Sequence, residues 1–338
     1  MTFCVRIFYT IRVSNRFNIV WRKVVLCVIR RYAWHVAGVI FVERANALIQ
    51  KNSTTQKRRR NNPVFFVVDL RVFLLRTGVD PVRYTCMKKN KEDIKILYMQ
   101  LRKDKESCDE EFEDMISLTG LSPAQFRTWN IFFEPHFPLD ELETYDAMIA
   151  GGSSDDDKYA PTVEPDVFPG AAHAKHIVRY CFDNAVPTFA SCMGFLIALE
   201  VLGTEIIIDT GTHEEGYYNI FPTEDGKKDT LFQGMGDSFF AISFHKKRAA
   251  TVPDGCVLLA YSDLCAVHAF KKYNAPFYAF QFHPEMTRAG YIAKLERYTE
   301  RYVGADKKDE VIRHIKETCP EMTESNSLLT TFIDRIVL

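Results

Sequence analysis

From residue 94 onward, short apolar runs alternate with longer amphipathic or acidic segments. The apolar runs predict β-strands at 94–101, 126–133, 145–152 and 186–191. The segments 109–118 and 170–184 lie between these runs and have the length and polarity of helices. Strands and helices that alternate in this way form βαβ units, whose parallel sheet is covered by helices on both faces. We therefore predict a doubly wound α/β fold with a mostly parallel sheet.

The hydrophobic pattern changes after Gly203, where the apolar runs become shorter and no helix-length segments separate them. Such runs are typical of hairpins, so we expect an antiparallel edge added to the parallel sheet. The runs are found at 205–211, 217–223, 238–244, 256–262, 266–270 and 277–282. Two helices, at 287–303 and near 309–317, are expected to close the chain.

Charge divides the chain near Met87. Residues 1–86 carry 16 lysines and arginines against three acidic residues, whereas the remainder carries an excess of acids. We predict a basic N-terminal extension at 1–86, a main domain at 87–305 and a C-terminal helical tail at 306–338. Three interpretations of the extension stay open: a poorly structured or mis-assigned start, a targeting segment, or a small binding arm that includes the basic run at 56–62.

Cysteine usage bears on the compartment. The nine cysteines include no C-x-x-C pair, and their odd number does not suit a disulfide framework. This pattern favours a reducing compartment, so we expect a cytoplasmic protein. Lysine or arginine interrupts the apolar stretches well before the ~20 residues that a membrane span needs. We expect no membrane partner, and no nucleic-acid partner for the main domain.

The run VPTFASCMGFLIALEVLG, residues 186–203, places a cysteine where a buried strand turns into a buried helix. Cys192 would stand at the carboxyl edge of the sheet, where open α/β folds bind their ligands. The first N–H groups of the following helix point to the same place and can stabilise an anion there. A lone cysteine in an apolar run is usually a core residue, so this signal is modest by itself.

A second stretch, FYAFQFHPEMT at 277–287, ends a predicted strand with a histidine and a glutamate. A thiol nucleophile needs a base to accept its proton, and that base needs a carboxylate to orient it. His283 and Glu285 can supply both groups at the end of the strand, and the proline between them stiffens the turn. Cys192, His283 and Glu285 are therefore a candidate catalytic triad.

At these residues the sequence resembles the class I glutamine amidotransferase family, which includes the glutaminase domain of GMP synthase. The glycine pair in AGGS at 150–153, the elbow SCMG at 191–194 and the run QFHPE at 281–285 carry the resemblance. The resemblance spans about residues 94–303. It implies a flavodoxin-like fold and an enzyme that hydrolyses the side-chain amide of glutamine through a cysteine thioester.

The resemblance also implies a role for each matching residue. Cys192 would be the nucleophile, His283 the general base and acid, and Glu285 the orienting carboxylate. The backbone N–H groups of Gly152 and Met193 would form the oxyanion hole. Substrate binding would involve Gly151, Ser243, Phe244 and His245. The chemistry requires no metal and no organic cofactor.

One residue departs from the family pattern. Many members continue the elbow as C-x-G-x-Q, with a glutamine that helps to bind substrate, whereas this chain has Leu196. A site that loses a polar partner loses recognition. Three functions therefore stay open: a glutaminase whose ammonia passes to a separate synthetase, a γ-glutamyl hydrolase of the same fold, and a catalytically silent scaffold or regulatory module.

Two further groups of residues invite a metal-site interpretation. His213, Glu214 and Glu215 do not have the H-E-x-x-H spacing of a zinc helix, and we expect them in a solvated loop. Cys256 and Cys265 lie in apolar runs, and we expect them to be core residues.

Overall fold

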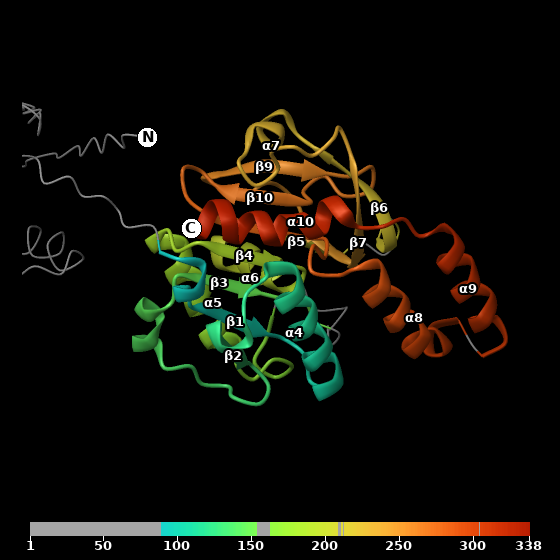
Figure 1. The fold of residues 1–338 in the computed structure, drawn as a ribbon, viewed down its shortest axis with the longest axis horizontal. Coiled ribbons are helices and arrows are strands. Elements are labelled where there is room, and N and C mark those ends of the chain that lie inside the picture. Colours follow the sequence, from blue (N-terminus) through green and yellow to red (C-terminus); the bar gives the residue numbers. More distant parts are fainter. Residues whose placement is uncertain (1–88, 154–162, 209–210, 212, 304) are drawn as a thin grey trace, which may run out of the picture. The chain divides into compact units, whose positions relative to one another are not determined.

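The structure is a computed structural model that describes residues 89–153, 163–208, 211, 213–303 and 305–338. Side chains are described throughout these ranges except at 298–307. The predictions for residues 1–86 lie outside the described part of the chain. Figure 1 shows the fold of the described residues, in which strands and helices alternate around one main sheet.

A nine-stranded sheet forms the centre of the fold, in the order β2-β1-β3-β4-β11-β10-β9-β6-β7. Its first five strands are joined by parallel pairing, because helices cross over between them. They are β2 (Phe126–Asn130), β1 (Ile96–Gln100), β3 (Ala147–Ala150), β4 (Thr188–Ser191) and β11 (Phe277–Phe280). Since the strands of this half are almost entirely buried, they read as continuous apolar runs.

The other four strands of the sheet pair antiparallel and extend it beyond β11. They are β10 (Ala269–Lys272), β9 (Cys256–Tyr261), β6 (Glu214–Pro222) and β7 (Phe239–His245). A separate two-stranded sheet joins β5 (Ile206–Ile208) to β8 (Lys247–Ala249). The predicted doubly wound sheet with an added antiparallel edge is thus confirmed.

Helices cover both faces of the sheet. Helices α5 (Ala171–Asn184) and α6 (Met193–Leu202) pack on the face that carries Leu97 and Met99. Helix α4 (Lys105–Thr119) and helix α10 (Thr323–Phe332) pack on the face that carries Ile96 and Tyr98. Successive residues of β1 therefore point into different cores, as strand geometry requires. A short helix α7 (Glu224–Lys228) follows β6.

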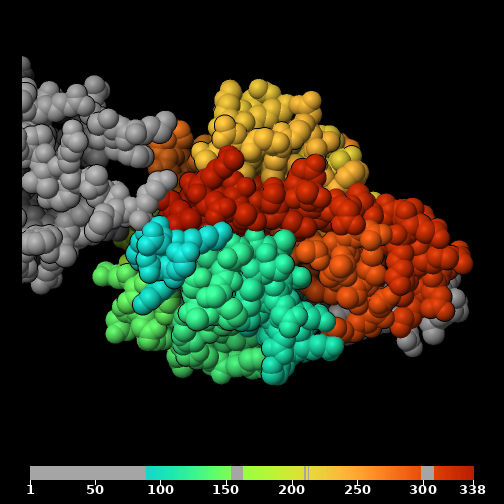
Figure 2. All heavy atoms as spheres, in the orientation of Figure 1, coloured from blue at the N-terminus to red at the C-terminus, as the bar shows by residue number. Residues whose placement is uncertain are grey.

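Three helices close the chain, where the sequence predicted two. Helices α8 (Arg288–Val303) and α9 (Ala305–Thr318) form a hairpin beside the sheet (Figure 1). The unpredicted helix α10 crosses the face of the molecule shown in Figure 2, next to α4. Leu328, Leu329 and Phe332 of α10 are fully buried in the second core. Within the described residues, none of the helices has the length and apolar character needed to cross a membrane.

Candidate active site

Cys192 lies in a strained backbone turn between strand β4 and helix α6. Its φ of 49° and ψ of −100° are rare for a residue with a side chain, and such strain is concentrated at functional sites. The Cys192 N–H donates to the carbonyl oxygen of Phe280 at 2.8 Å, which ties the turn to strand β11. A Cβ at Gly194 would lie 2.9 Å from the Cβ of Ala150, so only glycine lets α6 begin this close to β3.

His283 and Glu285 follow strand β11 and form a buried pair. The distance from His283 Nδ1 to Glu285 Oε1 is 2.8 Å, and each residue is only 3% exposed. The His283 N–H donates to the carbonyl oxygen of Ile242 at 2.8 Å, which fixes the backbone of His283 against β7. Glu285 can therefore orient the imidazole and leave its Nε2 atom for a reacting group.

Gly152 is the point where the cysteine and the histidine meet. A Cβ placed on Gly152 would lie 2.6 Å from His283 Cε1 and 3.3 Å from Cys192 Cβ. The structure therefore brings together the glycine pair after β3, the elbow after β4 and the histidine after β11. Cys192 keeps 8% of its surface exposed, more than His283 or Glu285.

The charges of the pair are coupled. Burial alone would lower the pKa of His283, but Cys192 and Glu285 outweigh burial and raise it well above its ordinary value. Burial alone would raise the pKa of Glu285, but His283 outweighs burial and lowers it. The arrangement thus favours a protonated imidazole between two anionic partners. It can hold the proton of a thiol and return it to a leaving group.

A buried ion pair supports the glycine turn from behind. The distance from Arg102 Nε to Glu111 Oε2 is 2.8 Å, and both side chains are buried. A Cβ at Gly151 would lie 2.3 Å from Glu111 Oε1, so this carboxylate packs directly against the turn. The carbonyl oxygen of Gly151 accepts from the Gly194 N–H at 3.2 Å, which links the turn to the first residues of α6.

The predicted substrate-binding segment at the end of β7 lies beside the histidine. The ring centroid of Phe244 is 6.4 Å from that of His283, and Phe244 is partly exposed. The neighbouring Ser243 is fully buried. His245 is buried as well, and its side chain faces Glu214 instead of the cysteine. Phe244 is therefore the side chain of this segment that approaches the reacting residues.

Sequence reasoning missed a second buried polar group. Glu214, which we expected in a solvated loop, is fully buried, and that expectation is wrong. Its carboxylate lies 3.1 Å from His245 Nε2 and 2.8 Å from His268 Nε2, and it accepts from the Ser262 hydroxyl at 2.5 Å. These residues come from four separate segments, so no local spacing in the sequence could have indicated the group. Cys265 is buried beside them, as expected of a core cysteine, whereas Cys256 is only half-buried.

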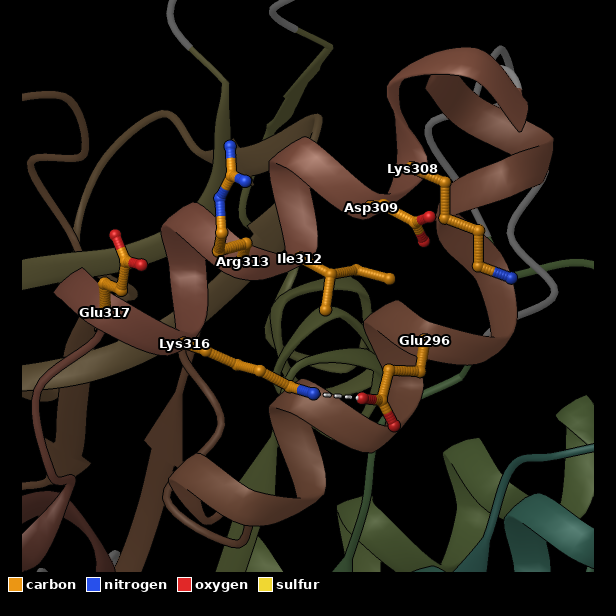
Figure 3. Close-up of a pocket in the computed structure, with 7 residues that line it drawn as sticks. All are labelled: Glu296, Lys308, Asp309, Ile312, Arg313, Lys316 and Glu317. Atoms are coloured by element: carbon orange, nitrogen blue, oxygen red, sulfur yellow. Dashed lines mark ion pairs between the residues drawn. The ribbon is translucent and has the colours of Figure 1, made fainter.

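A separate hollow of about 490 Å³ lies between α8 and α9 (Figure 3). It is open and mostly charged, and an ion pair of 2.6 Å joins Lys316 to Glu296 across it. Its lining residues are Glu296, Lys308, Asp309, Ile312, Arg313, Lys316 and Glu317. Cys192, His283 and Glu285 do not line it, so the hollow is a feature of the C-terminal hairpin.

Comparison with known proteins supports the resemblance found in the sequence. Residues 131–293 match the family model described as glutamine amidotransferase class-I. The chain is similar to the glutamine-hydrolysing subunit of GMP synthase from Methanocaldococcus jannaschii, with 28% identity over 46% of this chain and 73% of that protein. The protein of the same name from Methanothermobacter thermautotrophicus is also 28% identical, over 46% of this chain and 75% of that protein.

Solved structures support the fold. A glutamine amidotransferase from Thermotoga maritima superposes with a TM-score of 0.56 at 17% identity, over 72% of this chain and 98% of that chain. A glutamine amidotransferase from Methylobacillus flagellatus gives a TM-score of 0.51 at 15% identity, over 71% of this chain and 94% of that chain. At these identities the likeness concerns the fold alone.

Proposed function

Because residues 131–293 belong to the class I glutamine amidotransferase family, we propose that the protein hydrolyses the side-chain amide of glutamine to glutamate and ammonia. The observation that carries this proposal is the meeting of Cys192, His283 and Glu285 at Gly152. The sequence separates these residues widely, and the fold places a thiol, an imidazole and a carboxylate in one row. A scaffold has no physical need for this combination beside a strained turn.

In the first half of the proposed reaction, Cys192 Sγ attacks the amide carbon while His283 takes the thiol proton. A carbon–sulfur bond forms, and the carbonyl oxygen gains negative charge. The N–H groups of Gly152 and Met193 would stabilise this oxyanion, since one ends the β3 turn and the other begins helix α6. His283 then protonates the amide nitrogen, the carbon–nitrogen bond breaks, and ammonia leaves a γ-glutamyl thioester.

In the second half, water replaces ammonia as the group that reacts with His283. The imidazole takes a proton from water while the oxygen attacks the thioester carbon. The carbon–sulfur bond breaks, His283 returns the proton to sulfur, and glutamate is released. Glu285 holds the imidazole in the same orientation through both halves, which is the role that its 2.8 Å contact with Nδ1 supports.

We further propose that the ammonia passes to a separate synthetase. The two similar proteins described above are each named as one subunit of GMP synthase, which supports an arrangement in which a different polypeptide uses the ammonia. In this proposal residues 87–305 form the amidotransferase domain, residues 306–338 a C-terminal helical segment, and residues 1–86 a basic extension.

Hydrolysis of γ-glutamyl conjugates is a second candidate function, and Leu196 favours it. Leu196 packs into the first core and offers no hydrogen bond to the α-amino or carboxylate group of a free amino acid. A substrate recognised mainly through its γ-glutamyl carbonyl would depend less on that hydrogen bond. The same triad would then release an amine or a peptide instead of ammonia.

The test measures two products on the full chain: ammonia from free glutamine, and amine from a γ-glutamyl anilide. We expect ammonia release from glutamine, and we expect Cys192→Ser to abolish it. The matched control is Cys256→Ser, which changes a half-buried cysteine on β9 and should retain activity. Release from the anilide alone would favour the γ-glutamyl hydrolase. Absence of both products from the folded protein would contradict the enzymatic proposal and favour the scaffold.

A further inference from the structure

The buried group around Glu214 contains more nitrogen and sulfur atoms than its hydrogen bonds use. His245, His268 and Cys265 each offer one ligand atom, and these three atoms lie within 4.8 Å of one another. His268 is fully buried, and Cys265 is 1% exposed. Two imidazoles and a thiol are the donor set that zinc prefers in proteins.

Two ring nitrogens of this group call for a partner that a cation would supply. Glu214 lies beside the Nε2 atom of both imidazoles. The Nδ1 atoms of His245 and His268 have no hydrogen-bond partner within the described part of the chain. An unpaired buried polar atom costs about 1–3 kcal/mol, so two of them in one place favour the binding of an ion.

We propose that His245, His268 and Cys265 bind a zinc ion, with Glu214 supplying the balancing negative charge. Histidines that bind metal usually have a carboxylate next to the other ring nitrogen, which is the arrangement that Glu214 provides. Ligand atoms around tetrahedral zinc lie roughly 3.3–3.8 Å apart, given its bond lengths. A contraction of about 1 Å, within the range of side-chain adjustment, would close the site around the ion.

The site would be structural, because it ties together segments that converge next to the proposed triad. Glu214 begins strand β6, His245 ends strand β7, and Cys265 and His268 precede strand β10. The carbonyl oxygen of His268 accepts from the Gln281 N–H at 2.8 Å, two residues before His283. The ion would therefore hold the antiparallel edge in register against the strand that carries His283, without taking part in the reaction.

The experiment uses the full chain in a Cys192→Ser background, so that zinc cannot bind the triad thiol and activity is not the readout. Zinc content and affinity are measured by elemental analysis and by competition with a chromophoric chelator. We expect one tightly bound zinc ion per chain. Cys265→Ser and His268→Gln should each weaken its affinity by at least about 100-fold, since loss of an outer carboxylate alone costs 10–100-fold. The matched control, Cys256→Ser, should bind zinc unchanged.

Two readouts need no variant of the cluster. Cobalt bound in place of zinc should give the charge-transfer absorption of a cobalt–thiolate bond, and zinc should raise the thermal midpoint of the chelator-treated protein while magnesium should not. The proposal is overturned if the chelator-treated protein shows neither effect. It is also overturned if Cys265→Ser, shown to be folded by circular dichroism, binds zinc as tightly as its parent.

Discussion

The molecule contains two buried glutamates that each face histidine, and the surroundings of the two differ. Glu285 faces one histidine, whose other neighbour is Cys192. Glu214 faces two histidines and a serine hydroxyl in a closed group. The pKa of His283 is raised, whereas burial lowers the pKa of His268, because His268 shares its carboxylate with a second imidazole. The same pair of residue types thus gives a proton carrier in one place and a packed polar group in the other.

The difference lies in what stands next to each imidazole. At His283 the neighbours are a strained elbow and a glycine without a side chain, which together keep a reactive thiol beside the ring. At His268 the neighbours are the β6, β7 and β10 segments, which cover the ring completely. Chemistry therefore requires an opened and strained surrounding in addition to the Glu–His pair.

The largest expected effect comes from removing the imidazole of the open pair. His283→Gln should lower the rate constant for glutamine hydrolysis on the order of 10⁴-fold or more, because the thiol loses its base and the leaving group its acid. The matched control is His176→Gln, an exposed histidine on α5, which should change the rate little. Steady-state kinetics measure both. A His283→Gln enzyme that retains a tenth of the activity would contradict the assignment.

Closing the gap at Gly152 should have the next largest effect. The new methyl group of Gly152→Ala would lie 2.6 Å from His283 Cε1, so the imidazole must shift away from the sulfur. Misplacement on the order of 1 Å costs roughly 10²-fold in rate. Gly236→Ala is the control, because its methyl group would meet its nearest neighbour at 3.5 Å. Equal rates for the two variants would show that Gly152 does not border the reacting atoms.

The buried ion pair behind the turn allows a test of stability. Arg102→Met leaves Glu111 buried without its partner and should lower the free energy of unfolding by about 3–5 kcal/mol. The double change Arg102→Met with Glu111→Leu should recover most of that loss, because no charge stays unpaired. Lys105→Met, which removes an exposed ion pair with Asp109, should cost under about 1 kcal/mol. Chemical denaturation measures all three, and a single change as mild as Lys105→Met would contradict the account.

The smallest expected effect is a shift in a titration. The pKa of His283, measured by NMR on histidine-labelled protein, should lie well above 6.5 and should fall in Cys192→Ser, which removes one anionic partner. A raised folded-state pKa adds stability below the unfolded value near 6.5, and this contribution is lost as pH rises toward about 10. An ordinary pKa, unchanged by Cys192→Ser, would show that thiol and imidazole are not coupled.

The sequence predicted the parallel half of the fold well, because each strand there is a continuous apolar run and each crossover has helical length. It also predicted the antiparallel edge, through the shorter runs after Gly203. It missed helix α10, whose residues show no clear stop or start signal after Pro320. Propensity is weak in such segments, and packing of Leu328 and Phe332 on the second core decides the helix.

For the site, the sequence indicated those residues that lie in short local motifs. Cys192 and Gly194 share an elbow, and His283 and Glu285 share a turn, so their spacing carried information. The Arg102–Glu111 pair and the group around Glu214 join residues from separate segments. Their proximity exists only after folding, and no spacing along the chain could reveal it.

The most direct test of the central claim asks which atom of the protein becomes bonded to the glutamyl group. The protein is mixed with glutamine, quenched in acid within one turnover and analysed by peptide mass spectrometry. We predict a γ-glutamyl thioester on Cys192 alone, absent from Cys192→Ser and more abundant when the attack of water is slowed in Glu285→Gln. Turnover of glutamine by the wild-type protein with the adduct on another residue, or equal turnover by Cys192→Ser, would contradict the account.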